Sequence, residues 1–176
     1  GMTPHGLKEL VRELFTHGGS GTYVRRGEAI IEFASKDSVN AGLLTSLVEE
    51  SFGRRLQAGW WDEVPLVQAI ITKEYRAAAI ITRPAGIDVP YLDKFAVAEN
   101  ARGEGLAKGV WQKLAATTPL FYLRSRTNNG FNDFYQANTD GCVKRGEWTV
   151  FWKGEADLAR VAPVAEKILA LPDSFE

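Results

Sequence analysis

The pattern of apolar and polar positions predicts a strand, a glycine-rich turn and a helix in the middle of the chain. Residues 91–98 are mainly apolar and indicate a buried strand, which a short polar stretch ends. From Leu106 to Leu114 every fourth residue is apolar, the period of a helix that buries one face. Gly103 and Gly105 lie in the turn between them. The rest of the chain is organised around this unit.

The same patterns predict the other elements. Strands are expected at 28–33, 67–72, 76–82, 120–125, 142–144 and 148–152, and helices at 39–52, 131–137 and 156–171. Asp37 or Ser38 is the expected N-cap of the first of these helices, and Pro163 is expected to kink the last. The order predicts an α/β domain with a mixed sheet, mostly antiparallel in its first half.

The first part of the chain differs from the rest. Its two opening residues are typical of an expression-tag scar, and residues 3–15 predict a short amphipathic helix. A glycine-rich stretch from His17 then has the composition of a linker. We therefore expect a tag scar plus helix and linker at 1–25 and a folded domain at 26–176.

Composition narrows the classes of function. Lys and Arg number 21 against 22 for Asp and Glu, so no basic excess points to nucleic acid or a membrane surface. The single cysteine, Cys142, is expected to be an inert core thiol in a reducing, cytoplasmic compartment. His5 and His17 make no metal-binding spacing with it, so no metal is expected. No apolar run is long enough for a membrane span.

The glycine turn has a chemical use. The first N–H groups of a helix lack partners and lie at the positive end of its dipole. Gly103 and Gly105 leave these amides open to a phosphate, and Arg102 adds a cation beside them. For the turn alone, an ordinary strand-to-helix connection with a solvated arginine is the alternative.

The hexapeptide Arg102-Gly-Glu-Gly105-Leu-Ala107 resembles the pyrophosphate loop of the Gcn5-related N-acetyltransferases (GNAT), Gln/Arg-x-x-Gly-x-Gly/Ala. The predicted order of elements is also that of this family. The resemblance implies a GNAT acyl-CoA N-acyltransferase fold, an α/β fold whose mixed, mostly antiparallel sheet is flanked by helices. It also implies acetyl-CoA as cosubstrate.

Further segments, from about residue 9 to residue 153, resemble the acetyltransferase domain of acetylglutamate synthases, in the vertebrate-like and bifunctional synthase/kinase branch. They are Glu13-Leu-Phe-Thr-His17, Gly21-Thr22, Arg25-Arg-Gly27, Ser51-Phe-Gly-Arg54, Tyr91-Leu-Asp-Lys-Phe95, Arg124-Ser-Arg126, Asn129, Tyr135, Asp140-Gly141 and Trp148–Trp152. In that family an amino-acid kinase domain precedes this one, which accounts for the helix and linker at 1–25. A homodimer or larger homo-oligomer is also implied.

The cationic residues can be weighed without the family. Glutamate carries two carboxylates, and Arg124 and Arg126 point to the same face of their predicted strand. Lys94 lies in an apolar strand, and Arg54 follows a helix. The alternatives are a solvated arginine pair held by Asp133 or Asp140, and a lysine paired with Asp93 or Glu74.

The resemblance implies roles for particular residues. Substrate carboxylates and backbone would be held by Phe52, Arg54, Lys94, Arg124, Arg126 and Asn129, although the family often has lysine at position 54. The pantetheine arm of acetyl-CoA would pair with the backbone of Phe95, Ala96 and Val97. Its pyrophosphate would bind Arg102, Gly103, Glu104, Gly105, Leu106 and Ala107.

The expected reaction is direct acetyl transfer from acetyl-CoA to the α-amino group of L-glutamate, the first step of arginine biosynthesis. We expect Tyr135 to protonate the departing thiolate, Tyr91 to deprotonate the amine through water, and Asn129 to orient it. One alternative is a non-catalytic, regulatory acetyl-CoA-binding and oligomerisation domain of an acetylglutamate kinase-like protein. Another is acetyl transfer to a different acidic acceptor, such as aspartate or a peptide N-terminus.

Overall fold

The computed structural model describes residues 28–176, and the part of the chain predicted to be a tag scar, helix and linker lies outside them. These residues form a seven-stranded sheet in the order β1-β2-β3-β4-β5-β7-β6. The strands are β1 Ile30–Phe33, β2 Leu66–Thr72, β3 Ala77–Thr82, β4 Tyr91–Val97, β5 Phe121–Arg126, β6 Gly141–Arg145 and β7 Trp148–Lys153. All neighbours are antiparallel except β4 and β5, which confirms the predicted mixed sheet.

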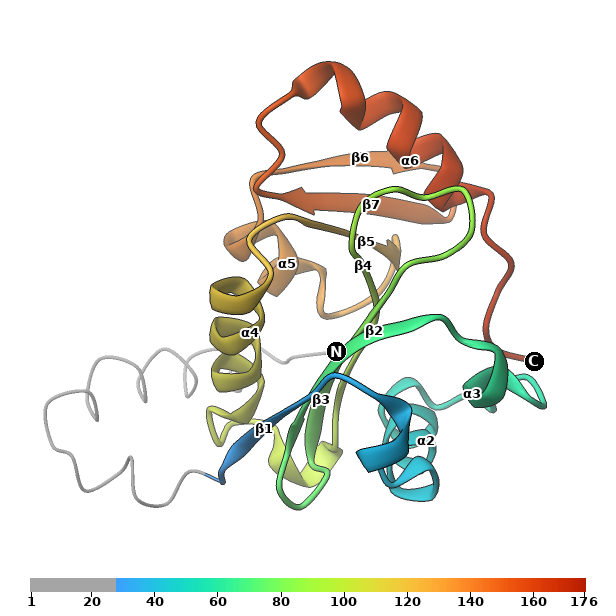
Figure 1. Ribbon diagram of the computed structural model, residues 1–176. Coiled ribbons are helices and arrows are strands. Elements are labelled where there is room, and N and C mark those ends of the chain that lie inside the picture. Colours follow the sequence, from blue (N-terminus) through green and yellow to red (C-terminus); the bar gives the residue numbers. More distant parts are fainter. Residues whose placement is uncertain (1–27) are drawn as a thin grey trace, which may run out of the picture.

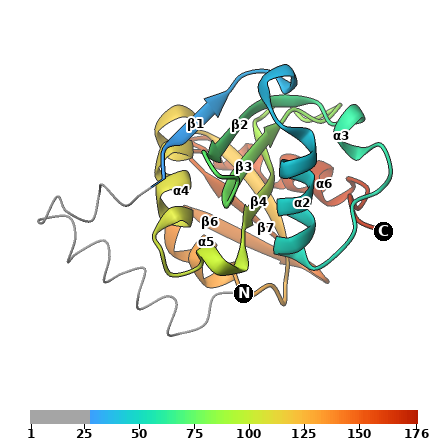
Figure 2. The ribbon, with the colours of Figure 1, turned by 90° about the horizontal axis from the view of Figure 1, so that it is seen from below.

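Helices cover both faces of this sheet. They are α2 Ala41–Phe52, α3 Trp60–Glu63, α4 Leu106–Thr117, α5 Asn132–Asn138 and α6 Val161–Leu169, with 3₁₀ turns η2 Lys36–Ser38, η3 Glu99–Ala101 and η4 Leu158–Arg160. In Figures 1 and 2, α2 and α4 lie on opposite sides of the β1–β4 half, while α6 covers β5 and β7.

The central strands are apolar on both sides because they lie between these helix layers. All six residues of β3 are buried, and three of them are alanines that let the flanking elements approach closely. Gly109 of α4 packs on Ile30 of β1, where an added Cβ would lie 2.9 Å from the Cδ1 atom. The sheet thus holds one core against α2, α4 and α5 and a second beneath α6.

The sheet opens between its two parallel strands. β4 and β5 pair only at Tyr91 and Tyr122, and then diverge. On its other edge β4 carries an irregularity, because Ile80 pairs with Lys94 but Ile81 pairs with Leu92. The residue between them, Asp93, has no partner in β3, which is the arrangement of a β-bulge.

Two helix starts differ from the sequence prediction. Asn40, not Asp37 or Ser38, caps α2: its side-chain oxygen accepts the N–H of Leu43 at 3.0 Å. Asp37 and Ser38 lie in η2, where the Ser35 hydroxyl accepts the Asp37 N–H. A short 3₁₀ turn thus precedes the helix, and α2 begins two residues after the predicted start at residue 39.

The last helix begins at Val161 and not at Ala156, because residues 158–160 form η4. Leu158, at the start of this 3₁₀ turn, is 72% exposed. Pro163 is the third residue of α6, where a backbone N–H would have no partner within the helix. A proline there removes no helical hydrogen bond, so it does not require the predicted kink. Cys142 is exposed on β6, so the prediction of a core thiol was wrong.

A substitution at Gly154, which follows β7, would test the packing of the β5–β7 half of the sheet. The φ of Gly154 is 78°, and an added Cβ would overlap the carbonyl oxygen of Pro119. We expect Gly154→Ala to lower the free energy of unfolding by about 3 kcal/mol, from backbone strain plus the clash. Gly86 has φ 83° but open space around it, so Gly86→Ala should lose only about 1 kcal/mol. Urea denaturation compares the two, and equal losses would contradict the clash.

Candidate active site

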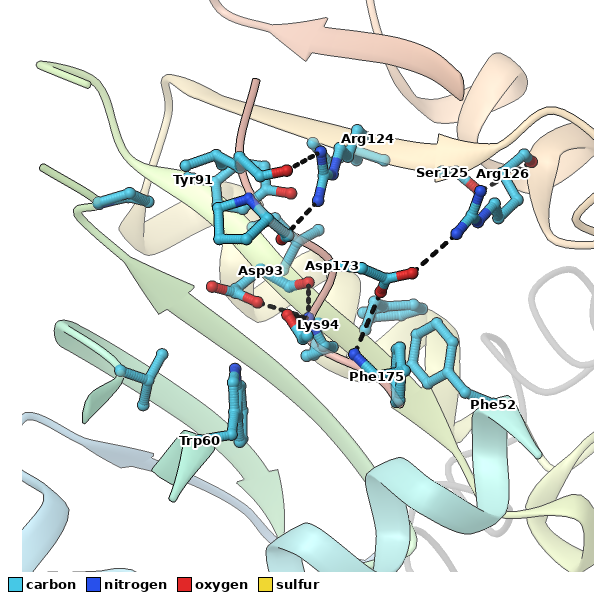
Figure 3. A pocket seen from close by; sticks show the side chains of 18 of the residues that line it. Phe52, Trp60, Tyr91, Asp93, Lys94, Arg124, Ser125, Arg126, Asp173 and Phe175 are labelled. Carbon is cyan, nitrogen blue, oxygen red and sulfur yellow. Dashed lines mark hydrogen bonds and ion pairs between the residues drawn. The ribbon is translucent and has the colours of Figure 1, made fainter. Parts of the chain in front are cut away.

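A cavity of about 640 Å³ lies where β4 and β5 diverge. It is lined by strand residues, the end of α2, the start of α3, and a segment after α6 (residues 171–176) (Figure 3). Nine of the residues predicted to form the site line it together: Phe52, Arg54, Tyr91, Lys94, Phe95, Arg124, Arg126, Asn129 and Tyr135. Residues scattered over more than eighty positions of the chain thus meet in one cavity.

The β-bulge in β4 presents an ion pair to this cavity. Lys94 is only 7% exposed, and its ammonium lies 2.6 Å from Asp93 Oδ1 and 2.9 Å from Ser174 Oγ. It also lies 5.4 Å from the ring centroids of both Trp60 and Phe175. The alternative in which Lys94 pairs with Asp93 is therefore confirmed, but the pair faces the cavity and does not lie at the core rim. A buried lysine needs such partners to remain charged.

Arg124 and Arg126 point to one face of β5, as predicted, and each guanidinium lies 4.1 Å from the ring centroid of Trp148. Arg124 donates to four carbonyl oxygens at the end of α6 and just beyond it, those of Ile168, Leu169, Leu171 and Pro172. Its charge thus satisfies the unpaired carbonyls at the negative end of that helix.

Arg126 has different partners. It donates to Asp173 at 2.8 Å and to Glu147 at 3.2 Å. Arg54 donates to Asp173 at 3.3 Å and to the backbone oxygen of Glu176 at 2.8 Å. Asp173, and neither Asp133 nor Asp140, is therefore the carboxylate that Arg54 and Arg126 share. The 171–176 segment thus supplies an anion that faces both arginines.

The cavity also contains residues that sequence reasoning did not assign to the site. Among them are Trp60, Asp93, Trp148, Asp173, Ser174 and Phe175. Asp93 carried a signal, because it is an acidic residue inside an apolar strand next to Lys94. Asp173 carried none, because it follows the last predicted helix and its place depends on how the chain turns after α6.

The two tyrosines of the predicted mechanism lie in apolar surroundings. Burial raises the pKa of Tyr135, whose ring packs against Phe95, Trp111 and Phe151. Burial also raises the pKa of Tyr91, with the Asp93 charge adding to the effect and the Arg124 guanidinium opposing it. Both hydroxyls therefore keep their protons at neutral pH.

Asn129 has a structural partner. Its side-chain oxygen accepts the backbone N–H of Phe131 at 2.8 Å, just before α5 begins. Because α5 carries Tyr135, this bond helps to fix the helix on which the tyrosine lies. Whether Asn129 also orients an amine stays a prediction.

The glycine turn lies at the other end of β4 from Tyr91 and does not line the cavity. Gly103 and Gly105 have φ values of 86° and 78°, in the left-handed region that favours glycine, and Gly105 is the N-cap of α4. Glu104 forms an ion pair with Arg76, just before β3. The turn is thus held by its acidic residue, while its glycines give the backbone its shape.

The edge of β4 facing the gap can be assigned from its hydrogen bonds. The N–H of Ala98 donates to Arg76, on the β3 side, whereas the N–H of Val97 donates to Ser51 Oγ at 3.0 Å. N–H directions alternate along a strand, so the N–H groups of Phe95 and Val97 both face the gap, whereas the N–H of Ala96 faces β3. Of the three residues predicted to pair through their backbone, two therefore direct their N–H groups away from β3.

Within residues 28–176, no group of three or more His, Cys, Asp or Glu side chains is arranged to hold a metal ion. None of the helices described in that range is long and apolar enough to cross a bilayer.

The open sheet and the glycine turn before α4 define the class of protein, a GNAT-type acetyltransferase fold. A putative GNAT acetyltransferase from Desulfovibrio desulfuricans matches with a TM-score of 0.55 at 12% identity, over 73% of this chain and 100% of the other. Ard1 from Thermoplasma volcanium matches with a TM-score of 0.50 at 14% identity, over 71% and 95% of the two chains. At these identities the likeness shows the fold alone, and it confirms the predicted fold.

The sequence identifies the family. Residues 31–170 match the family described as NAT, the N-acetyltransferase of N-acetylglutamate synthase, and the chain belongs to this family. It is 46% identical to an acetylglutamate kinase of Xanthomonas campestris pv. campestris over 149 residues, 83% of this chain and 35% of that protein. It is 35% identical to human mitochondrial N-acetylglutamate synthase over 169 residues, 94% of this chain and 32% of that one. The chain thus spans about a third of the length of these relatives.

Arg124 is expected to stabilise the fold as well as line the cavity. Replacing it in Arg124→Gln leaves the carbonyls after α6 without their charged donor, and we expect a loss of about 2 kcal/mol in the free energy of unfolding. Arg83→Gln is the control, since exposed Arg83 makes only a 3.4 Å bond to the backbone of Asp88. Urea denaturation measures both, and equal stability of the two variants would contradict the assignment.

Proposed function

We propose that this domain transfers the acetyl group of acetyl-CoA to the α-amino group of L-glutamate, giving N-acetylglutamate. One observation carries the proposal: Arg54, Lys94, Arg124 and Arg126 line a single cavity at the opening of an acetyltransferase sheet. An acceptor with two carboxylates suits such a cluster, because charged hydrogen bonds are stronger than neutral ones. Membership of the N-acetylglutamate synthase family supports the same acceptor.

The residues around the opening fit acetyl-CoA. The N–H groups of Phe95 and Val97, directed away from β3, suit the amide groups of a pantetheine arm lying along β4. In this arrangement the Val97 N–H leaves the Ser51 hydroxyl. Gly103 and Gly105 at the start of α4 suit the pyrophosphate, where backbone N–H groups and the helix dipole favour anions.

The chemistry requires the amine of glutamate to lose a proton before its nitrogen attacks the thioester. As the N–C bond forms and the C–S bond breaks, the leaving thiolate takes a proton. Tyr135, whose raised pKa keeps its hydroxyl protonated, suits this donor role. Tyr91 suits a relay through water and not a free phenolate, because its pKa is also raised. Among residues 28–176, no cysteine or histidine lines the cavity, which favours direct transfer over an acetyl-enzyme.

The relatives support a kinase domain in the full-length protein. This chain is similar to about a third of an acetylglutamate kinase, which supports the predicted amino-acid kinase domain preceding the acetyltransferase domain. The homo-oligomer and the cytoplasmic location stay predictions.

The decisive experiment is thiol release from acetyl-CoA by the chain with L-glutamate, with L-aspartate and with no acceptor. Release with glutamate alone supports the proposal. Release with aspartate at equal rate favours another acidic acceptor, and acetyl-CoA binding without release favours the regulatory alternative.

Arg126 tests the acceptor site. We expect Arg126→Gln to raise the KM for glutamate by about 10- to 100-fold, because one charged hydrogen bond to a carboxylate is lost. The KM for acetyl-CoA should not change. Arg145→Gln is the control, because Arg145 is exposed on β6 and bonds only to the adjacent backbone oxygen. An unchanged KM for glutamate in Arg126→Gln would remove Arg126 from the acceptor site.

Tyr135 tests the proton donor. Tyr135→Phe should lower kcat by about 10²- to 10⁴-fold with the KM for acetyl-CoA unchanged. In the unsubstituted protein kcat should not fall between pH 8 and about pH 10, because the raised pKa keeps the hydroxyl protonated there. Tyr122→Phe is the control: its hydroxyl bonds to Glu155 at 3.0 Å, away from the cavity. Unchanged turnover in Tyr135→Phe would contradict the role.

A further inference from the structure

The cationic cluster of the cavity already has an anion opposite it, and this anion belongs to the chain. After α6 the backbone runs from the β5–β7 side of the opening to the neighbourhood of α3 and the end of α2 (Figure 1). Residues 171–175 of the 171–176 segment therefore line the cavity that the proposed acceptor must enter. Leu56 pairs with Phe175 in an isolated antiparallel bridge, which holds the segment on the far side.

Asp173 is the centre of this contact. A single carboxylate oxygen, Oδ2, lies 2.8 Å from Arg126 (Figure 3) and 3.3 Å from Arg54. The other oxygen accepts the backbone N–H of Phe175 at 3.1 Å. Burial acts to raise the pKa of Asp173, but this N–H and the two guanidinium charges outweigh it, so the pKa lies below its ordinary value. At neutral pH the carboxylate is charged.

The neighbours of Asp173 bind the same side of the cavity. The Ser174 hydroxyl lies 2.9 Å from the Lys94 ammonium. The Phe175 ring packs 5.1 Å from that of Phe52, and Phe175 is only 7% exposed. The segment thus contacts all four cations assigned to a substrate with two carboxylates, because the carbonyls of Leu171 and Pro172 also accept from Arg124.

The segment also lies outside the part of the chain that identifies the family. The family match covers residues 31–170, so every predicted substrate-binding residue lies within it and Asp173 lies beyond it.

We propose that Asp173 is an internal competitor of the acceptor: its carboxylate occupies the place of one acceptor carboxylate between Arg54 and Arg126. Glutamate must displace the Asp173 side chain to reach both guanidinium groups, while the backbone of the segment stays anchored by Phe175. The residue therefore sets the apparent affinity for the acceptor. This inference rests on the proposed acetyl transfer to glutamate.

The chemistry favours competition over a purely structural role for Asp173. Packing the segment against the cavity needs only apolar contacts, which Phe175 already makes with Phe52. Asp173 instead places a charged carboxylate on two guanidinium groups that would otherwise face each other across the cavity. Like charges held together favour any anion that comes between them, and a free amino acid and this side chain offer the same group.

The test uses Asp173→Asn, which keeps an oxygen for the Phe175 N–H but removes the charge. We expect the KM for glutamate to fall by about three- to tenfold, the size of effect expected for partly exposed ion pairs, with kcat and the KM for acetyl-CoA unchanged. Asp88→Asn is the matched control, because the Asp88 side chain is 77% exposed and forms an ion pair only with Arg160, at 3.5 Å. The melting temperatures of both variants confirm that they are folded.

A double-mutant cycle with Arg126→Gln separates competition from a structural role. If Asp173 competes for Arg126, the gain in glutamate affinity from Asp173→Asn shrinks in the Arg126→Gln background. A structural effect would be the same in both backgrounds, which would overturn the proposal. An unchanged or raised KM in the single variant would overturn it too.

Calorimetric titration of L-glutamate, with coenzyme A present, tests the inference without turnover. Tighter binding to Asp173→Asn than to the unsubstituted chain supports the competitor role even where no acetyl transfer is seen, which would contradict only the proposed function. Normal turnover with equal or weaker binding to the variant would contradict only the competitor role. Glutamate that binds neither form would overturn both.

Discussion

The separation of β4 from β5 is the constraint on which the rest of this structure depends. Two parallel strands that pair at one position and then diverge leave backbone groups of β4 without a sheet partner. Such groups are costly to bury, so the opening must be filled by a side chain, a ligand or water. The Ser51 hydroxyl fills one such place, at the N–H of Val97. The gap is therefore both a weakness of the sheet and the place where the proposed cosubstrate fits.

The second constraint is electrostatic. Lys94 of β4 is almost fully buried, and the two arginines of β5 share a single tryptophan ring, so positive charge gathers on both strands that border the gap. Charge of one sign gathered in this way requires compensation. The protein compensates it in three ways: with Asp93 in the bulge, with carbonyl oxygens after α6, and with Asp173. Only the last two lie on the segment after β7, so the end of the described chain completes the site.

The fold followed from the sequence to a large extent. The apolar pattern alone predicted strands β2, β3 and β4 and the helix after the glycines. It did so because the sequence of each element reflects its extensive burial. The errors fell where short-range hydrogen bonds compete with the helix. Ser35 and Asp157 cap 3₁₀ turns where longer helices were expected, and such local bonds leave the apolar pattern unchanged.

The sequence by itself determined which residues are candidates for the chemistry: the family motifs named the cations, both tyrosines and the glycine turn, since residue type and spacing along one element are local properties. Only the tertiary structure decided what faces them. The partner of Arg126 is Asp173, forty-seven positions away, and that of Arg54 is the same carboxylate. No periodicity encodes such a contact, because it depends on the direction in which the chain leaves α6 and on the width of the gap that it crosses.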